Sequence, residues 1–232
     1  MSLDSNDAAE FARLSMELLA EPDSSQTLQR VVDRARECVP HATHSGVFLR
    51  QPDGSVESPA LTDPLVSKLD LLQIELSEGP CLEALEDDQT FVIDDTTTES
   101  RWANWCKGAA DAGVRSVLSV RMATPSHLGS CLNIYSGSVQ AFDDDAVLTA
   151  QIYATHAGNA ITATDQRDQL NTALQTRHVI GVAQGLLMQR YGITEAAAFQ
   201  VLARHSQDRN VKLRAVAREL LQLAERSGGR LP

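Results

Sequence analysis

The chain has 232 residues, of which 43% are hydrophobic, and this is enough for one large or two modest domains with buried cores. The charged fraction of 22% is ordinary for a folded protein and argues against wholesale disorder. No apolar run approaches the roughly 18 residues that span a bilayer. Residues 1–7 also lack the basic and apolar regions of a secretory signal. We therefore expect a cytoplasmic protein with no membrane association.

The net charge of −11 is distributed unevenly along the chain. Residues 1–167 contain 11 Lys and Arg against 26 Asp and Glu, whereas residues 168–232 contain 9 against 5. The basic side chains between residues 176 and 218 are Arg177, Arg190, Arg204, Arg209, Lys212, Arg214 and Arg218. An acidic chain with one basic module places any polyanionic partner at that module.

The N-terminal part mixes predicted helices and strands. One helix is predicted from Phe11, Leu14 and Leu18, and a second, after a cap signal at residues 23–25, from Leu28, Val31, Val32, Ala35 and Val39. Runs of β-type residues follow at 45–50, 55–57, 90–93, 116–122 and 128–135. Turn signals at residues 51–54 and 125–127 connect strands as hairpins. The pattern predicts an antiparallel α+β sheet covered by helices.

From Asp143 onward the sequence turns helical. Residues 144–191 form either one very long helix or two helices that meet near residues 163–167. Leu170, Ala173, Ile180 and Leu187 make a nearly heptad-spaced apolar seam, which favours contact with a second copy of the chain.

Three helices complete the chain. The first ends at Gly192, since glycine readily takes the left-handed conformation that ends helices. Gly185 in its interior lowers helix stability by about 1 kcal/mol relative to alanine, and this predicts the close approach of a neighbouring helix or an RNA backbone. The second begins at the cap Thr194, buries Ala198, Phe199 and Leu202, and ends near Gln207. The third is capped by Asn210 and carries a one-sided stripe that includes Leu213, Val216, Ala217, Leu220 and Leu221. Residues 227–232 are expected to form a flexible tail.

These helices contain a specific combination of motifs. Small residues lead into an apolar triplet at residues 183–188, a stop glycine follows, and residues 206–214 read Ser-Gln-Asp-Arg-Asn-Val-Lys-Leu-Arg. The combination resembles the ANTAR module of bacterial transcription antiterminators over nearly its whole length. The resemblance implies a dimer that binds paired RNA stem-loops and prevents a terminator from folding.

The N-terminal region carries a second resemblance. Its motifs are Glu-Gly-Pro-Cys-Leu-Glu-Ala at residues 78–84, Arg101-Trp102, and the segments 113–119 and 132–136. They resemble the GAF domains that accompany ANTAR modules in regulators of the actinobacterial type. The resemblance implies a sensor of an unknown small-molecule effector or a redox signal, with a GAF-like domain at residues 1–165 and an ANTAR domain at residues 166–226.

Recognition of an RNA loop needs cations for phosphates and amide groups for unstacked bases. The candidate RNA-binding residues are Arg177, Arg190, Arg204, Gln207, Arg209, Asn210, Lys212 and Arg214. A purely structural alternative is open for several of them. Asn210 can simply cap the third helix, Ser206 and Gln207 can satisfy carbonyls at a helix end, and Arg177 and Arg190 can be solvated charges.

The candidate ligand-binding residues of the sensor are Phe91, Trp102, Trp105, Arg115 and Tyr135. Core packing is the alternative for the four rings. The sequence shows no phosphate-cradling glycine loop, no metal-spaced histidines, no Cys-x-x-Cys pair and no Gly-x-Ser-x-Gly elbow. We therefore predict no metal, no cofactor and no enzymatic activity.

Two other functions fit the same features. A DNA-binding regulator with a GAF sensor is one, because the third helix begins with Lys212-Leu213-Arg214, which can read bases in a groove. A signalling adaptor that binds only protein is the other, with its basic helices docked on an acidic partner. Salt-dependent binding to hairpin RNA, compared with duplex DNA and with protein, separates the three.

Overall fold

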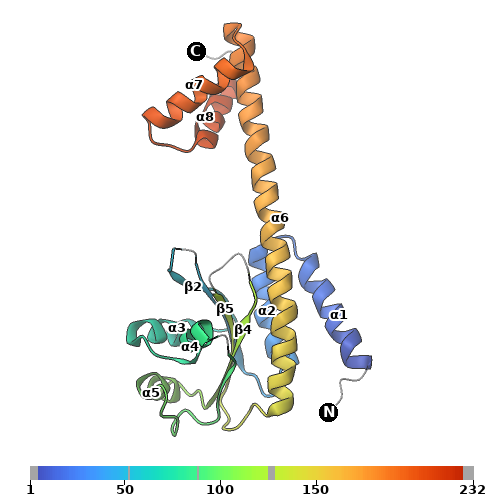
Figure 1. Cartoon of the computed structure of the whole chain (residues 1–232), viewed down its shortest axis with the longest axis vertical. Coiled ribbons are helices and arrows are strands. Elements are labelled where there is room, and N and C mark those ends of the chain that lie inside the picture. The colour runs from blue at the N-terminus through green and yellow to red at the C-terminus, as the bar shows by residue number, and fades with distance from the viewer. Residues whose placement is uncertain (1–4, 52, 88, 125–128, 227–232) are drawn as a thin grey trace. The chain divides into compact units, whose positions relative to one another are not determined.

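The computed structural model describes residues 5–51, 53–87, 89–124 and 129–226 (Figure 1). Contacts divide the chain into two compact units, which we call the sensor unit (residues 1–167) and the helical unit (residues 168–232). The turn predicted at residues 125–127 and the tail predicted at residues 227–232 lie outside the described residues.

The sensor unit is built on a five-stranded antiparallel sheet with the strand order β2-β1-β5-β4-β3. The strands are β1 (His44–Arg50), β2 (Val56–Leu61), β3 (Phe91–Ile93), β4 (Ser116–Met122) and β5 (Gly129–Ser136). In the centre, Val47 of β1 pairs with Leu132 of β5, and Ser119 of β4 pairs with Asn133. The predicted antiparallel α+β architecture is therefore confirmed.

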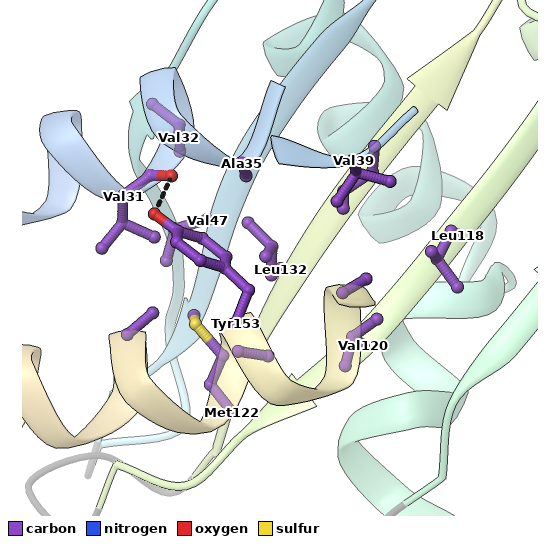
Figure 2. Close-up of a cluster of buried hydrophobic side chains, with 14 of the residues drawn as sticks. Val31, Val32, Ala35, Val39, Val47, Leu118, Val120, Met122, Leu132 and Tyr153 are labelled. Carbon is purple, nitrogen blue, oxygen red and sulfur yellow. Dashed lines mark hydrogen bonds between the residues drawn. The ribbon is translucent and has the colours of Figure 1, made fainter. Parts of the chain in front are cut away.

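One face of the sheet is covered by α1 (Ser5–Ala20), α2 (Ser24–Cys38) and the first part of α6 (Asp144–Tyr191). Alternate strand residues supply the sheet side of this core, among them Leu118, Val120 and Leu132 (Figure 2). The buried hydroxyl of Tyr153 on α6 donates to the carbonyl oxygen of Val31 on α2 at 2.9 Å, which satisfies its one polar group (Figure 2).

The opposite face is covered by α3 (Pro64–Leu76), α4 (Pro80–Asp87) and α5 (Ala103–Asp111). All eight residues of β5 are buried, because helices cover both faces of the central strand. These three helices are absent from the predicted element order. In α3 the reason is that apolar residues lie all around the helix, with Leu71 and Ile74 exposed while Val66 and Leu69 are buried, so no one-sided stripe marks it.

The helical unit consists of the last part of α6, α7 (Glu195–Asp208) and α8 (Leu213–Arg226). The region from Asp144 to Tyr191 is one helix of 48 residues. As predicted, α6 stops at Gly192, whose φ is 62°, and the Thr194 hydroxyl caps α7 by accepting from the Ala197 N–H at 3.3 Å. The core of the unit contains Ala183, Leu187, Ala198, Leu202, Val216 and Ala217.

Two predictions about buried positions in these helices are wrong. Phe199 is 41% exposed, because its neighbour Ala198 faces the core and adjacent helical residues point about 100° apart. Leu187 is only 5% exposed and Ile180 packs against the same core, so both belong to the unit's own interior. The predicted seam of Leu170, Ala173, Ile180 and Leu187 therefore does not form one free face.

The prediction that Asn210 caps the third helix is also wrong. Helix α8 begins at Leu213, and Asn210 instead takes a left-handed conformation with a φ of 49° in the connection from α7. Asparagine tolerates this conformation better than most residues do. The Asn210 N–H donates to the Gln207 carbonyl at 3.1 Å, so the residue closes the turn that ends α7.

Close packing of α6 on the sheet predicts the effect of a single methyl group. A Cβ added at Gly158 would lie 2.6 Å from the carbonyl oxygen of Ala123, a backbone atom that cannot move aside cheaply. We expect Gly158→Ala to lower the free energy of unfolding by about 1 to 3 kcal/mol, despite the better helix propensity of alanine. Denaturant unfolding of the sensor unit measures this change in the free energy of unfolding.

The control is Asn159→Ala at the exposed neighbouring position. This variant gains helix propensity without a clash, so its stability should be unchanged or higher by up to about 0.5 kcal/mol. Equal stability of both variants would contradict the proposed close contact.

Candidate nucleic-acid interface and sensor core

Three cations line one hollow on the helical unit, which we call the basic hollow. Lys212 immediately precedes α8, Arg214 lies in its first turn, and Arg218 follows four residues later on the same side. The hollow has a volume of about 520 Å³ and also includes Glu219 and Gln222. Convergent cations on a concave surface form a binding site for phosphate groups.

The other predicted RNA-binding residues do not line this hollow. Arg177, Arg190, Arg204, Gln207, Arg209 and Asn210 are all exposed, on α6, on α7 or in the turn after it. The guanidinium of Arg190 lies 5.6 Å from the ring centre of Tyr191. Arg204 and Gln207 are three residues apart on α7 and share its outer side. The structure thus brings together Lys212 and Arg214 and leaves the rest distributed over the unit.

Arg209 is paired within the chain. Its Nη1 atom lies 2.6 Å from Oε2 of Glu219 on α8, and both side chains are about half exposed. Ser206 donates its hydroxyl hydrogen to the Val211 carbonyl at 2.5 Å, so this serine has a structural role, although the carbonyl that it satisfies lies in the connection and not at the end of α7. Both contacts hold the connection between α7 and α8.

Two residues of this surface are missing from the predicted site. Arg218 lines the basic hollow and also a second hollow with Leu174 and His178 of α6. Its four-residue spacing from Arg214 is the signal that could have found it, because such residues lie on one side of a helix. Tyr191 is 58% exposed. It directly precedes the glycine that ends α6, and at this position the sequence pattern does not show whether the ring is buried or exposed.

The predicted ligand-binding rings of the sensor unit lie together. Trp102, Trp105 and Tyr135 are buried in one cluster, and Phe91 meets Trp102 edge to face with ring centres 5.4 Å apart. The Trp105 indole N–H donates to the Leu69 carbonyl at 3.0 Å, and that of Trp102 donates to a carboxylate oxygen of Glu83 at 2.7 Å. The rings therefore pack as core residues with satisfied polar atoms.

Arg115 lies apart from these rings. Its Nη2 atom contacts both carboxylate oxygens of Asp95, at 3.0 and 3.1 Å. Hydrogen bonds from Thr97, which contribute most, and the Arg115 guanidinium hold the pKa of Asp95 below its usual range. Asp95 therefore serves to close a turn and to hold Arg115.

The segment 78–84 connects α3 to α4 and ties both to α5. A carboxylate oxygen of Glu78 accepts a hydrogen bond from the backbone N–H of Trp105 at 2.8 Å. The side-chain oxygen of Gln73 accepts one from the backbone N–H of Cys81 at 2.9 Å. With the bond from Trp102 to Glu83, three polar residues fix the helices that cover this face of the sheet. The motif thus has a structural function.

A buried polar layer lies between α3 and the sheet. Asp70 is 1% exposed and accepts hydrogen bonds from Ser58 at 2.6 Å and from Asn133 and Tyr135 at 3.4 Å each. Asn133 in turn accepts from Ser119 and from the thiol of Cys131. These three donors to Asp70 are neutral, so burial prevails and raises the pKa of Asp70 to about 6.

No group of three metal-binding side chains exists among the residues that the structure describes. Within the same ranges, no helix is long and apolar enough to cross a membrane.

The profile of the GAF domain family matches residues 21–162, which is more than half of the chain. The chain belongs to the GAF domain family. The profile of the ANTAR domain matches residues 168–221, so a C-terminal ANTAR domain follows the GAF domain. These matches identify the two domains without narrowing them to the actinobacterial type. No curated protein sequence matches the chain.

Solved structures resemble the GAF domain. That of a phosphoenolpyruvate-protein phosphotransferase from Coxiella burnetii is 19% identical, with a TM-score of 0.54 over 70% of this chain and 96% of that one. The GAF domain of the Acinetobacter phosphoenolpyruvate-protein phosphotransferase is 12% identical, with a TM-score of 0.52 over 68% and 93%. A bacteriophytochrome from R. palustris is 11% identical, with a TM-score of 0.61, but this chain covers only 47% of it. These likenesses show the fold alone.

The buried carboxyl of Asp70 predicts a dependence of stability on pH. Its pKa is about 6 in the folded protein, against 3.8 for an ordinary aspartate in an unfolded chain, so the folded state binds this proton more tightly. The resulting stabilisation is complete below pH 3.8 and is lost as the pH rises through 6. A shift of about two pKa units corresponds to about 3 kcal/mol in the free energy of unfolding. Asp70→Asn should therefore gain stability relative to the wild type between about pH 4.5 and about pH 7.5, by up to that amount.

Denaturant unfolding at the two pH values measures this difference. The control is Asp53→Asn, because hydrogen bonds from Ser55 lower the pKa of Asp53 below 3.8. Its linkage acts only at lower pH, so the stability difference between this variant and the wild type should not change between about pH 4.5 and about pH 7.5. A stability difference between Asp70→Asn and wild type that does not change with pH would contradict the raised pKa.

Proposed function

We propose that this chain is a signal-responsive, cytoplasmic RNA-binding transcription antiterminator. The GAF domain detects a small-molecule or redox signal, and the ANTAR domain binds tandem RNA stem-loops as a homodimer. The observation that carries the proposal is the basic hollow of Lys212, Arg214 and Arg218 on the ANTAR domain of an otherwise acidic chain. Phosphates are attracted to this domain and repelled by the acidic GAF domain.

Exposed side chains elsewhere on the helical unit are suited to base contacts. Gln207 and Asn210 present amide groups, which both donate and accept hydrogen bonds, while Arg177, Arg190 and Arg204 extend the positive surface. Arg209 joins them when its bond to Glu219 is exchanged for a bond to RNA. We retain all of these as candidate RNA contacts.

The sensing step requires a change of packing in the GAF domain. Phe91, Trp102, Trp105 and Tyr135 remain the candidate ligand contacts, and Arg115 is a further one. Trp102 lines a surface hollow of about 670 Å³ together with Glu78, Glu83 and Arg101, so a ligand can reach its edge without a rearrangement. Because Trp105 and Tyr135 are buried, a ligand reaches them only when α3, α4 or α5 moves. Such a ligand shifts the protein between two states only by its difference in affinity for them.

The homodimer is supported by an exposed stripe on α6, which we call the α6 stripe. It consists of Leu170, Leu174, Gly181, Gly185 and Met188, whose spacings of three, four and seven place them on one side of the helix. Leu170 and Leu174 are 65% and 64% exposed. Apart from the adjoining backbone of α6 itself, no atom of the described part of the chain lies within 4 Å of a Cβ placed at Gly181 or Gly185. The close neighbour that the sequence predicts at Gly185 is therefore not a helix of the same chain, and a partner's α6 fits this place.

RNA binding by the basic hollow predicts a specific salt response. We expect Lys212→Ala, Arg214→Ala and Arg218→Ala each to weaken binding to tandem hairpin RNA about tenfold at low salt, whatever the loop sequence. Each lost phosphate contact should also flatten the slope of log K against log salt by roughly 0.7. Fluorescence anisotropy with labelled RNA measures both quantities.

The control is Arg36→Ala, an exposed cation of the GAF domain, which should change neither quantity. Tighter binding to duplex DNA than to hairpins supports the DNA-binding regulator instead. Binding to neither nucleic acid leaves the protein-binding adaptor.

The α6 stripe predicts which exposed leucine maintains the dimer. Leu174→Glu should convert the protein to a monomer at micromolar concentration, because burial of a carboxylate in an apolar helix seam is costly. Leu71→Glu alters a leucine of α3 that is also exposed, at 55%, and should remain dimeric. Light scattering coupled to size exclusion measures the mass. A monomeric wild type, or a dimeric Leu174→Glu, contradicts the proposed seam.

A further inference from the structure

An apolar groove lies between the end of α6, α7 and α8, separate from the basic hollow. It has a volume of about 570 Å³. Its walls include Tyr191, Val201 and Leu223, which are 58%, 40% and 41% exposed although their side chains are largely apolar. Open apolar side chains of this kind at a concave surface favour binding of a flat apolar group.

The rim of this groove is polar at one place. Arg209 and Glu219 both line it, with Nη1 of the arginine 2.6 Å from Oε2 of the glutamate, and His205 lies on the same wall. The pair presents hydrogen-bond donors directly beside an acceptor. Because both side chains are about half exposed, their bond to one another can be exchanged for bonds to a ligand at small cost.

We propose that this groove takes an unstacked purine base from the RNA loop. The proposal rests on the RNA-binding function proposed above and names a site within it. The two flat faces of the base contact the Tyr191 ring and the apolar walls, as unstacked bases do on aromatic side chains. An arginine donor beside a carboxylate acceptor matches a base edge that has an acceptor next to a donor, such as O6 and N1–H of guanine or N7 and the amino group of adenine. Pyrimidines have such edges too, and the larger ring system of a purine is favoured because it covers more of the Tyr191 ring and the apolar walls.

The occupant follows from the position of Glu219, which lines both the groove and the basic hollow. A strand whose phosphates lie on Lys212, Arg214 and Arg218 therefore places a neighbouring base at the groove. An uncharged apolar helix would find no counterpart for the positive charges next to it, and charge complementarity favours the nucleic acid. Glu219 then contributes to specificity. A carboxylate beside phosphate sites weakens RNA binding in general, and only a base that donates a hydrogen bond to it offsets this loss.

The experiment uses the full chain and a pool of RNA hairpins whose loop is randomised. Bound RNA is sequenced for the wild type, for Glu219→Gln and for Tyr191→Leu. We expect the wild type to enrich a purine at one loop position. Glu219→Gln should change the preference at that position about tenfold while the pool as a whole binds at least as well. Tyr191→Leu, which keeps the groove apolar, should weaken the enriched loop about tenfold with an unchanged salt slope.

Two matched variants separate this proposal from the general one. Glu225→Gln removes an exposed carboxylate of the same helix away from the groove and should leave the preference unchanged. Arg218→Gln should weaken all loops alike. Salt-dependent binding without a purine preference, or with the same preference in Glu219→Gln, overturns the base site and leaves the RNA-binding function standing. If no hairpin binds, the proposed function itself fails.

Discussion

Gly158 allows α6 to lie against the backbone of Ala123 at the end of β4, and this contact is the constraint on which the packing of α6 against the sensor sheet depends. One turn earlier on the same helix, Tyr153 donates to Val31 of α2. Further along, Ala183 and Leu187 of this same helix belong to the core of the helical unit. One helix therefore supplies core residues to the sensor sheet and to the nucleic-acid module. In the proposed function, a signal acts through this shared element.

The two faces of the sheet differ in the polarity of the side chains buried between the sheet and its covering helices. The face under α6 is mostly apolar, and its buried Tyr153 and Ser45 hydroxyls both donate to carbonyl oxygens of α2, although Nε of Arg34 on α2 is buried without a hydrogen-bond partner in the described ranges. The face under α3 contains Asp70 among neutral donors, and the side-chain N–H₂ group of Gln73 is buried without a hydrogen-bond partner in the described ranges. An unsatisfied buried group costs free energy that a rearrangement can recover. In the proposed function we expect a signal to act on the α3 face, which combines this amide with the buried Asp70 carboxyl.

The sequence predicts those elements that carry a local signal. The one-sided stripe of α8, the run of β-type residues in β4 and the cap at Thr194 are such signals. Helix α3 is not predicted, because its apolar residues surround it. Leu187 is predicted in a dimer seam, since spacing cannot tell which neighbour a stripe meets. Asn210 is predicted as a cap, since both caps and left-handed turns favour asparagine. The buried layer around Asp70 and Asn133 depends on pairing between distant segments, which no local pattern contains.

The proposed function is the binding of paired RNA hairpins, and through it opposition to termination. Crosslinking of the protein to RNA in its own host, followed by sequencing of the attached fragments, examines this binding where it would act. We predict that the crosslinked sites gather in pairs of adjacent hairpins, the second of which overlaps a transcription terminator. A variant lacking the cations of Lys212, Arg214 and Arg218 should lose these sites. Crosslinks scattered over unstructured RNA, or sites equally frequent in that variant, would contradict the proposed function.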